Sequence, residues 1–124
     1  MAMKILLDTN AVIALSNENA GIIESVNTAD EIFISIINEL EFKSFSKLSL
    51  HDIELFYAFV SQITVLDLLG SDTKLKNKVI DIRNAYKLKL PDSIIVTSAI
   101  VNNATLITAD KAFKKVSNLQ LKIY

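Results

Sequence analysis

Short apolar runs alternate with longer amphipathic segments along this chain. Runs rich in Ile, Val, Leu and Phe occur at residues 4–7, 31–36, 63–66 and 105–108, and a fifth lies at 119–123. Short apolar, β-branched runs bounded by turn-forming residues are typical of buried strands in a parallel sheet. The pattern therefore predicts four buried strands and a fifth strand at the edge of the sheet.

Segments with apolar residues at helical spacing separate these runs, and each predicts a helix. The predicted helices cover residues 11–15, 21–28, 38–48, 51–62, 71–87, 92–102 and 111–115. Asp92, next to Pro91, is the expected N-cap of its helix. The alternation predicts an α/β fold with three layers, α/β/α, around a central, mostly parallel sheet of four or five strands. No linker or repeat is visible, so we expect a single domain over 1–124.

Composition narrows the class of protein. Hydrophobic residues make up 51% of the chain, with only 2 Gly and 1 Pro, which favours a well-packed domain. The chain has no Cys, which excludes disulfides and Cys-based zinc sites. Its net charge is −1, so contact with nucleic acid would depend on a local basic patch or on metal ions. No apolar run has the length of a signal peptide or a membrane span, so we expect a cytoplasmic protein with no membrane segment.

Acidic residues fall where open α/β sheets bind ligands, which is beyond the carboxyl ends of the strands. Asp8 directly follows the first run, Asp110 lies just past the fourth, and Asp92 stands at the start of a helix. After the second run, Glu39 and Glu41 are both candidates. Each acid alone is also explained as a turn or capping residue. Their joint placement at strand ends is what favours a shared acidic site.

Helical phase separates the two glutamates. The predicted inward face carries Glu41 together with Ile37, Leu40, Ser44, Phe45 and Leu48. The predicted outward face carries Glu39 together with Phe42, Lys43 and Ser46. The segment from Asn38 to Glu41 also resembles a capping box, which places Glu41 in the first helical turn. We therefore predict that Glu41, and not Glu39, belongs to the site.

Four carboxylates in one crevice repel one another, and a divalent cation relieves that repulsion. Mg²⁺ and Mn²⁺ take oxygen ligands and bind carboxylates together with substrate phosphate. Such an ion lowers the pKa of a bound water and stabilises charge on a leaving oxygen, as phosphodiester hydrolysis requires. The predicted metal ligands and catalytic residues are Asp8, Glu41, Asp92 and Asp110.

Thr9, Asn10 and Thr108 lie next to these acids in the sequence. We expect them to orient the carboxylates through hydrogen bonds. The alternative is that they serve only as turn or helix-capping residues.

Four segments resemble the successive motifs of PIN domains, in the same order and at similar separations. They are residues 5–10 (Ile-Leu-Leu-Asp-Thr-Asn), 34–41 (Ile-Ser-Ile-Ile-Asn-Glu-Leu-Glu), 90–95 (Leu-Pro-Asp-Ser-Ile-Ile) and 106–113 (Leu-Ile-Thr-Ala-Asp-Lys-Ala-Phe). Each motif alone is weak, but the combination is specific and runs nearly end to end. The compact length and the segment 83–92 are most similar to VapC-type toxins.

The resemblance implies a PIN-like fold and Mg²⁺- or Mn²⁺-dependent endoribonuclease activity. It puts Asp8, Glu41, Asp92 and Asp110 in the acidic positions of the family. It also implies that the chain is the toxin component of a type II toxin–antitoxin pair. Such a toxin acts on RNA, is held inactive by a cognate antitoxin and forms a homodimer.

Basic residues near the motifs are candidates for RNA contact. Arg83, Lys89 and Lys111 are the predicted RNA-binding residues, and a solvated surface role is the alternative. The alternative function is a PIN-like fold that acts as a non-catalytic protein or RNA interaction module. A phospho-receiver domain is disfavoured, because that fold needs paired acids after the first strand and Asp8 is followed by Thr and Asn.

Overall fold

The computed structural model describes residues 2–124, in which a five-stranded sheet forms the central layer. Its strands are β1 (Lys4–Leu7), β2 (Glu31–Ser35), β3 (Thr64–Leu66), β4 (Thr105–Thr108) and β5 (Leu121–Ile123). The strand order is β3-β2-β1-β4-β5, and every neighbouring pair is parallel. The carboxyl ends of all strands therefore meet at one edge of the sheet.

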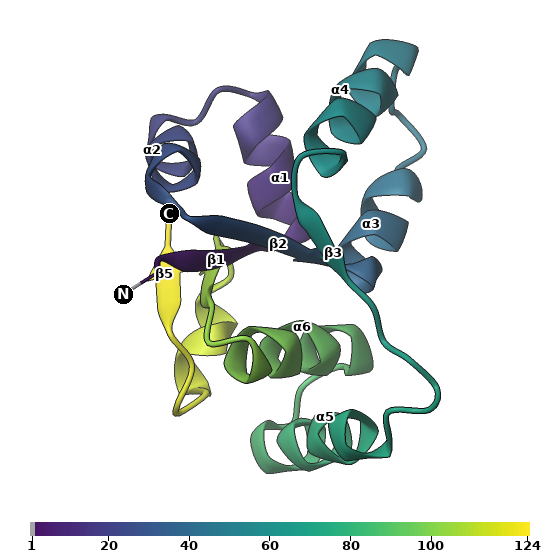
Figure 1. Cartoon of the computed structure of the whole chain (residues 1–124), viewed down its shortest axis with the longest axis vertical. Coiled ribbons are helices and arrows are strands. Elements are labelled where there is room, and N and C mark those ends of the chain that lie inside the picture. The colour runs from purple at the N-terminus through teal and green to yellow at the C-terminus, as the bar shows by residue number, and fades with distance from the viewer. Residues whose placement is uncertain (1) are drawn as a thin grey trace.

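Helices cover both faces of this sheet (Figure 1). One face carries α1 (Thr9–Ser16), α2 (Ala20–Thr28) and α4 (Leu50–Val60), and the other carries α6 (Leu90–Val101) with α5 (Thr73–Tyr86) packed on it. The remaining helices are α3 (Ile36–Lys43), which contacts both α1 and α6, and the 3₁₀ helix η1 (Lys111–Lys115). This arrangement confirms the predicted three-layer α/β/α fold.

Side chains along the central strands point alternately to the two faces of the sheet, which divides the core into two clusters. Ile5 and Leu7 point into the cluster under α1, α2 and α4, whereas Leu6 points into the cluster under α5 and α6. All three side chains are fully buried. Because both faces of β1 are covered, the strand is apolar at every position after Lys4, as expected for a buried parallel strand.

Two predicted helix caps were wrong. The helix after β2 begins at Ile36 and ends at Lys43, and its capping box pairs Ser35 with Asn38 instead of Asn38 with Glu41. The helix predicted to start at Asp92 begins at Leu90, and its N-cap is Lys89. In both cases the N-cap lies three residues earlier than predicted, at Ser35 instead of Asn38 and at Lys89 instead of Asp92.

The predicted outward position of Phe42 was also wrong. Phe42 is only 3% exposed, and its ring stacks on that of Phe56 from α4 with 4.1 Å between centroids. Leu40 and Phe45, which were predicted to face inward, are 56% and 43% exposed. Leu40 in α3 and Phe45, two residues beyond the end of α3, border a pocket and not the core.

None of the helices described in residues 2–124 has the combination of length and apolar character needed to cross a bilayer.

Candidate active site

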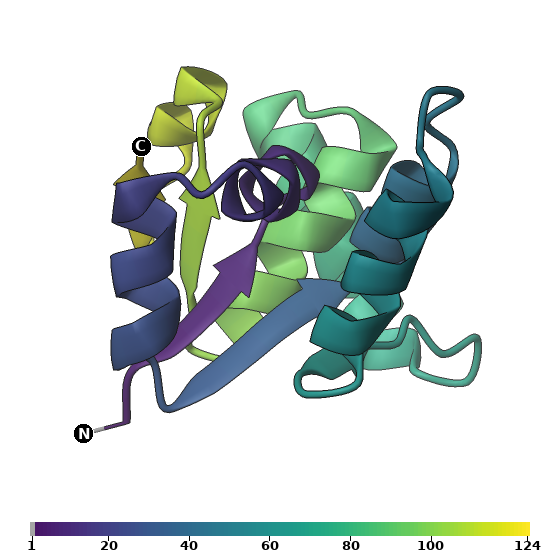
Figure 2. The ribbon, with the colours of Figure 1, turned by 90° about the horizontal axis from the view of Figure 1, so that it is seen from above.

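A pocket of about 590 Å³ opens at the carboxyl edge of the sheet. Its lining includes all four carboxylates predicted from the sequence, which are Asp8, Glu41, Asp92 and Asp110. Asp8 follows β1 and Asp110 follows β4, the direct neighbour of β1, and Figure 2 shows these two strands ending at the same edge. Glu41 comes from α3 and Asp92 from α6. The pocket therefore lies where the strand order reverses, which is the usual ligand site of open α/β sheets.

The carboxylate of Asp8 accepts hydrogen bonds from three elements. Its Oδ1 accepts a 2.8 Å bond from the backbone N of Thr9 and a longer, 3.4 Å bond from Nδ2 of Asn38. Its Oδ2 accepts a 2.8 Å bond from Oγ1 of Thr108. Donors on α1, α3 and β4 thus fix the orientation of this carboxylate.

Thr9 connects Asp8 to Glu41. The Thr9 hydroxyl donates a 3.0 Å hydrogen bond to Oε1 of Glu41 and accepts a 3.1 Å bond from Nδ2 of Asn38. Asn38 is fully buried, and its Oδ1 accepts a 2.9 Å bond from the backbone N of Ser35. A buried polar network with all its partners in place is rigid. Thr9 and Thr108 therefore contact the acids that they were predicted to orient.

Asp110 and Asp92 each lie at the start of a helix and line the pocket. Asp110 is the N-cap of η1, where its Oδ1 accepts a 2.9 Å bond from the backbone N of Ala112. Its own backbone N donates a 3.1 Å bond to Oγ1 of Thr108. Asp92 lies in the first turn of α6 and lines the pocket, while the capping position is taken by Lys89. The Asp92 carboxylate is therefore not used as a helix cap.

Burial and repulsion between acids both act on Asp92. Desolvation by burial is the largest cause that raises its pKa, and the charges of Asp8 and Asp110 raise it further. Lys89 and Lys115 oppose this shift through their positive charges. The positive charges of these two lysines therefore partly offset the repulsion between the acids.

Glu41 is affected in the same way. Burial raises its pKa, the hydrogen bond from Thr9 opposes the shift, and the charges of Asp8 and Asp92 add to it. The pocket thus carries more negative charge than its own groups neutralise, which favours a cationic ligand.

The donor chemistry fits a hard divalent cation. All four acids offer carboxylate oxygens, the ligands that Mg²⁺ and Mn²⁺ prefer. Within residues 2–124, no three His, Cys, Asp or Glu side chains are grouped closely enough to form a ready-made metal-binding cluster. Mg²⁺ keeps several waters and binds through one or two carboxylates plus substrate phosphate. The wider spacing of these four carboxylates is therefore compatible with such an ion.

The remaining predicted residues lie around the pocket or outside it. Asn10 is exposed and lines the pocket. Lys89 is the N-cap of α6, Lys111 begins η1, and Arg83 lies in the last turn of α5; all three are exposed and outside the lining. Glu39, as predicted, lies outside the pocket lining. It forms a 3.1 Å salt bridge with Lys43, one helical turn later.

Asn38 is the site residue that sequence reasoning missed. It was interpreted only as a helix cap, but it joins Asp8 and Thr9. Its signal in the sequence is an amide directly after Ile36 and Ile37, since a buried amide needs hydrogen-bond partners.

The chain is similar to known proteins over nearly its full length. The family model of the PIN domain matches residues 5–119. No curated protein matches the chain.

Solved structures share the fold. VapBC2 from Rickettsia felis, bound to a DNA fragment from its promoter, has a TM-score of 0.82 and 24% identity, with 98% of this chain and 99% of that chain covered. A toxin–antitoxin complex from Klebsiella pneumoniae has a TM-score of 0.77 and 25% identity, with 93% and 94% covered. VapBC-1 from nontypeable Haemophilus influenzae has a TM-score of 0.76 and 25% identity, with 98% of each chain covered.

Proposed function

Since this chain belongs to the PIN-domain family, we propose that it is a divalent-metal-dependent endoribonuclease that hydrolyses RNA phosphodiester bonds. The observation that carries the proposal is the set of four carboxylates, delivered by separate segments, that line one pocket. PIN-domain nucleases generally use divalent metal ions, and the oxygen donors of this pocket suit Mg²⁺ or Mn²⁺.

In this proposal all four acids hold the ion, and Glu41 has a second role. Asp8, Glu41, Asp92 and Asp110 would hold the ion, which supplies an activated water and neutralises charge on the phosphate. Asp8 has the most constrained carboxylate, because three donors fix it. Glu41 has a raised pKa, which suits a carboxylate that accepts a proton from an attacking water at its free Oε2.

We also propose that the chain is the toxin of a type II toxin–antitoxin pair and acts in the cytoplasm. Its structural neighbours are toxin–antitoxin complexes. On α4, Leu50 and Tyr57 are exposed and lie two helical turns apart on the same side of the helix, an apolar surface that suits an antitoxin or a second copy in a homodimer. Phe56, between them in the same helix, is buried and does not contribute to this surface.

A cleavage assay with three arms tests the nuclease proposal. The protein is incubated with mixed cellular RNA and Mn²⁺, then with EDTA in place of Mn²⁺, and finally as the Asp8→Asn variant with Mn²⁺. We expect cleavage in the first arm alone. Equal cleavage in all three arms would contradict the metal mechanism. No cleavage of any RNA with either ion would favour the non-catalytic interaction module.

A further inference from the structure

The positive charge of the chain is concentrated in α5 and the turn that follows it. Residues 72–89 hold six of the thirteen basic residues and only two of the fourteen acids, although the whole chain has a net charge of −1. All six basic side chains are exposed. In the described part of the chain the one salt bridge lies on α3, so none of the six has an acidic partner within 4.0 Å. This segment is therefore a cationic surface on an otherwise acidic protein.

α5 is the outermost helix on its side of the sheet, and it packs on α6 (Figure 1). Its buried residues are Val79 and Ile82, and Ile82 belongs to the core cluster under α6. Lys76 and Arg83 are seven residues apart, so they lie on one side of the helix, about 10 Å apart along its axis. Lys87 ends the helix one turn beyond Arg83. These three residues form a basic row along α5.

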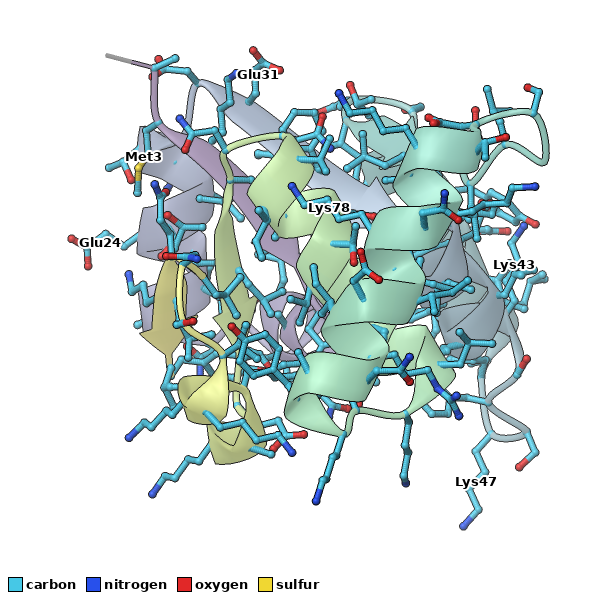
Figure 3. The ribbon with its side chains drawn as sticks, turned by 90° about the horizontal axis from the view of Figure 1, so that it is seen from below. Met3, Glu24, Glu31, Lys43, Lys47 and Lys78 are labelled. Carbon is cyan, nitrogen blue, oxygen red and sulfur yellow. The ribbon has the colours of Figure 1, made fainter. Side chains whose placement is uncertain are left out.

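The other two lysines of α5 lie on a different side of the helix. Lys74 and Lys78 line a pocket together with Ile100 and Val101, and Figure 3 shows Lys78 on the side of α5 that faces α6. The helical repeat places the basic row roughly half a turn around the helix from these two lysines. Asp81, the only acid within α5, follows Lys78 by three residues and shares its side. The basic row therefore contains no acid.

The basic residues are unfavourable for the helix itself. α5 has no acid in its first turn, and Lys74 and Lys76 lie near its N-terminus, where the helix dipole disfavours cations. Arg83 and Lys87 repel each other at a spacing of four residues. Lys87 also has φ 53° and ψ 46°, in the left-handed region where helix ends usually carry Gly or Asn. Residues that break several local preferences together are characteristic of functional surfaces.

We propose that the basic row of Lys76, Arg83 and Lys87 is a second RNA-contact surface, which holds the phosphate backbone of a long RNA outside the acidic pocket. The inference rests on the proposed function but concerns a different part of the molecule. A row of unpaired cations is complementary to the regularly spaced charges of the backbone.

The composition of this surface favours nucleic acid over a protein partner. Lysine is depleted in protein–protein interfaces, whose centres are apolar. Among the large apolar residues of α5, only Ile80 is exposed, and it lies between Lys76 and Arg83 in the sequence. A single apolar side chain among cations is too little for the centre of a protein interface, whereas phosphate contacts need only the charges.

The basic row leads toward the acidic pocket. Lys87 is followed, four and five residues later, by Pro91 and Asp92, which line that pocket. An RNA that is cut in the pocket can therefore continue along α5. Because contacts to phosphates read no bases, the added affinity depends on the length of the RNA and not on its sequence.

The backbone contacts are tested by the salt dependence of RNA binding. Fluorescence anisotropy is measured with a labelled single-stranded RNA of about 20 nucleotides in the Asp110→Asn background, which limits cleavage. Each phosphate contact contributes about 0.7 to the slope of log K against log salt, so Lys76→Gln/Arg83→Gln should reduce this slope by about 1.4. Lys74→Gln/Lys78→Gln removes the same charge from the other side of the same helix. This control pair should leave the slope unchanged.

RNA length separates the basic row from the pocket. Mn²⁺-dependent cleavage is measured, with all four acids intact, on the RNA of about 20 nucleotides and on one of about 4 nucleotides that occupies the pocket alone. Lys76→Gln/Arg83→Gln should raise KM for the long RNA roughly tenfold and leave kcat unchanged, because the contacts bind substrate and transition state alike. KM for the short RNA should stay the same.

A charge-preserving pair tests whether these side chains act through their charge. Lys76→Arg/Arg83→Lys should keep the slope and the KM of the parent protein, and urea unfolding verifies that every variant is folded. A loss in this pair as large as that in Lys76→Gln/Arg83→Gln would show that the two residues support the structure of α5 and do not bind phosphate.

Three further results would overturn the inference. They are equal slope losses in the two glutamine pairs, a KM increase of the same size for short and long RNA, and a loss of duplex DNA binding with unchanged binding of the long RNA. Failure of the proposed function has a different signature: the parent protein binds the long RNA with the expected slope but never cuts it with Mn²⁺. If RNA is cut and the two glutamine pairs behave alike, only this inference fails.

Discussion

Thr108 Oγ1 donates a 2.8 Å hydrogen bond to Oδ2 of Asp8, from a position 100 residues further along the chain. Thr108 is fully buried at the end of β4, where the parallel register places Ile107 opposite Leu7. The pairing of β1 with β4 thus brings the hydroxyl to the carboxylate. The orientation of Asp8 therefore depends on the sheet itself and not only on the turn that follows β1.

Thr108→Val should reduce Mn²⁺-dependent RNA cleavage by about 10- to 100-fold, because it leaves Asp8 without one of its orienting donors. It should also lower the free energy of unfolding by about 1–3 kcal/mol, since the backbone N of Asp110 loses its acceptor. Cleavage as a function of Mn²⁺ concentration and urea unfolding measure the two effects. Thr105→Val, in the same strand but bonded to Gln120, is the control and should cleave normally. Full activity in Thr108→Val would contradict this role.

Glu41→Gln should reduce cleavage by roughly 100-fold, because the pocket loses one of its four carboxylates. Glu39→Gln should be nearly silent, since it removes only a helical salt bridge on the other side of α3. Steady-state cleavage of a labelled RNA compares the two isosteric changes at the same protein concentration. A strong loss at Glu39 with none at Glu41 would reverse the assignment of the two glutamates.

Asp92→Asn should raise the thermal stability of the metal-free protein at neutral pH. The pKa of Asp92 lies above its ordinary value of 3.8, so the folded state binds this proton more tightly than the unfolded chain does. The associated stability is present at low pH and is lost as the pH rises through the raised pKa.

The midpoint difference between Asp92→Asn and the parent protein should therefore be positive near pH 7 and shrink as the pH falls toward about 4. Differential scanning calorimetry in EDTA measures it, with Asp67→Asn, an exposed residue after β3, as the control. A difference that is absent near pH 7, or that grows on acidification, would be inconsistent with repulsion and burial at Asp92.

Lys87→Gly should stabilise the protein by roughly 0.5–1 kcal/mol, because glycine adopts the left-handed conformation without the steric cost of a Cβ. Asn103 has the same φ of 53°, and Asn103→Gly should change stability less, since asparagine tolerates this region. Urea unfolding compares the two variants. A Lys87→Gly protein that is less stable than the parent would show that the lysine side chain makes stabilising contacts.

The sheet could be predicted from the sequence because its signals are local. The run at Thr105–Thr108 has the same bounds in the structure as in the pattern, since apolar β-branched residues and flanking turns define it directly. The acids could be placed because each follows a strand or starts a helix, and parallel strands bring those points together.

The orientation of α3 could not be predicted, because it depends on contacts between distant elements. Phe42 is buried in a cluster that includes Phe56 of α4, whose ring stacks on it. Leu40 and Phe45 were predicted as core positions because apolar residues that border a pocket have the same helical spacing as those that border the core. Asp92 was predicted as the N-cap because Asp is common at N-cap positions, whereas here the helix begins at Leu90.

We propose that the carboxylates of Asp8, Glu41, Asp92 and Asp110 act together on one divalent-cation site. Electron paramagnetic resonance of free Mn²⁺ measures ion binding directly and does not depend on RNA cleavage. We predict that the parent protein and Glu39→Gln bind Mn²⁺ alike, and that neutralising any one of the four acids weakens binding by about tenfold or more. A parent protein that leaves Mn²⁺ free, or four variants that bind it as tightly as the parent, would contradict a shared cation site.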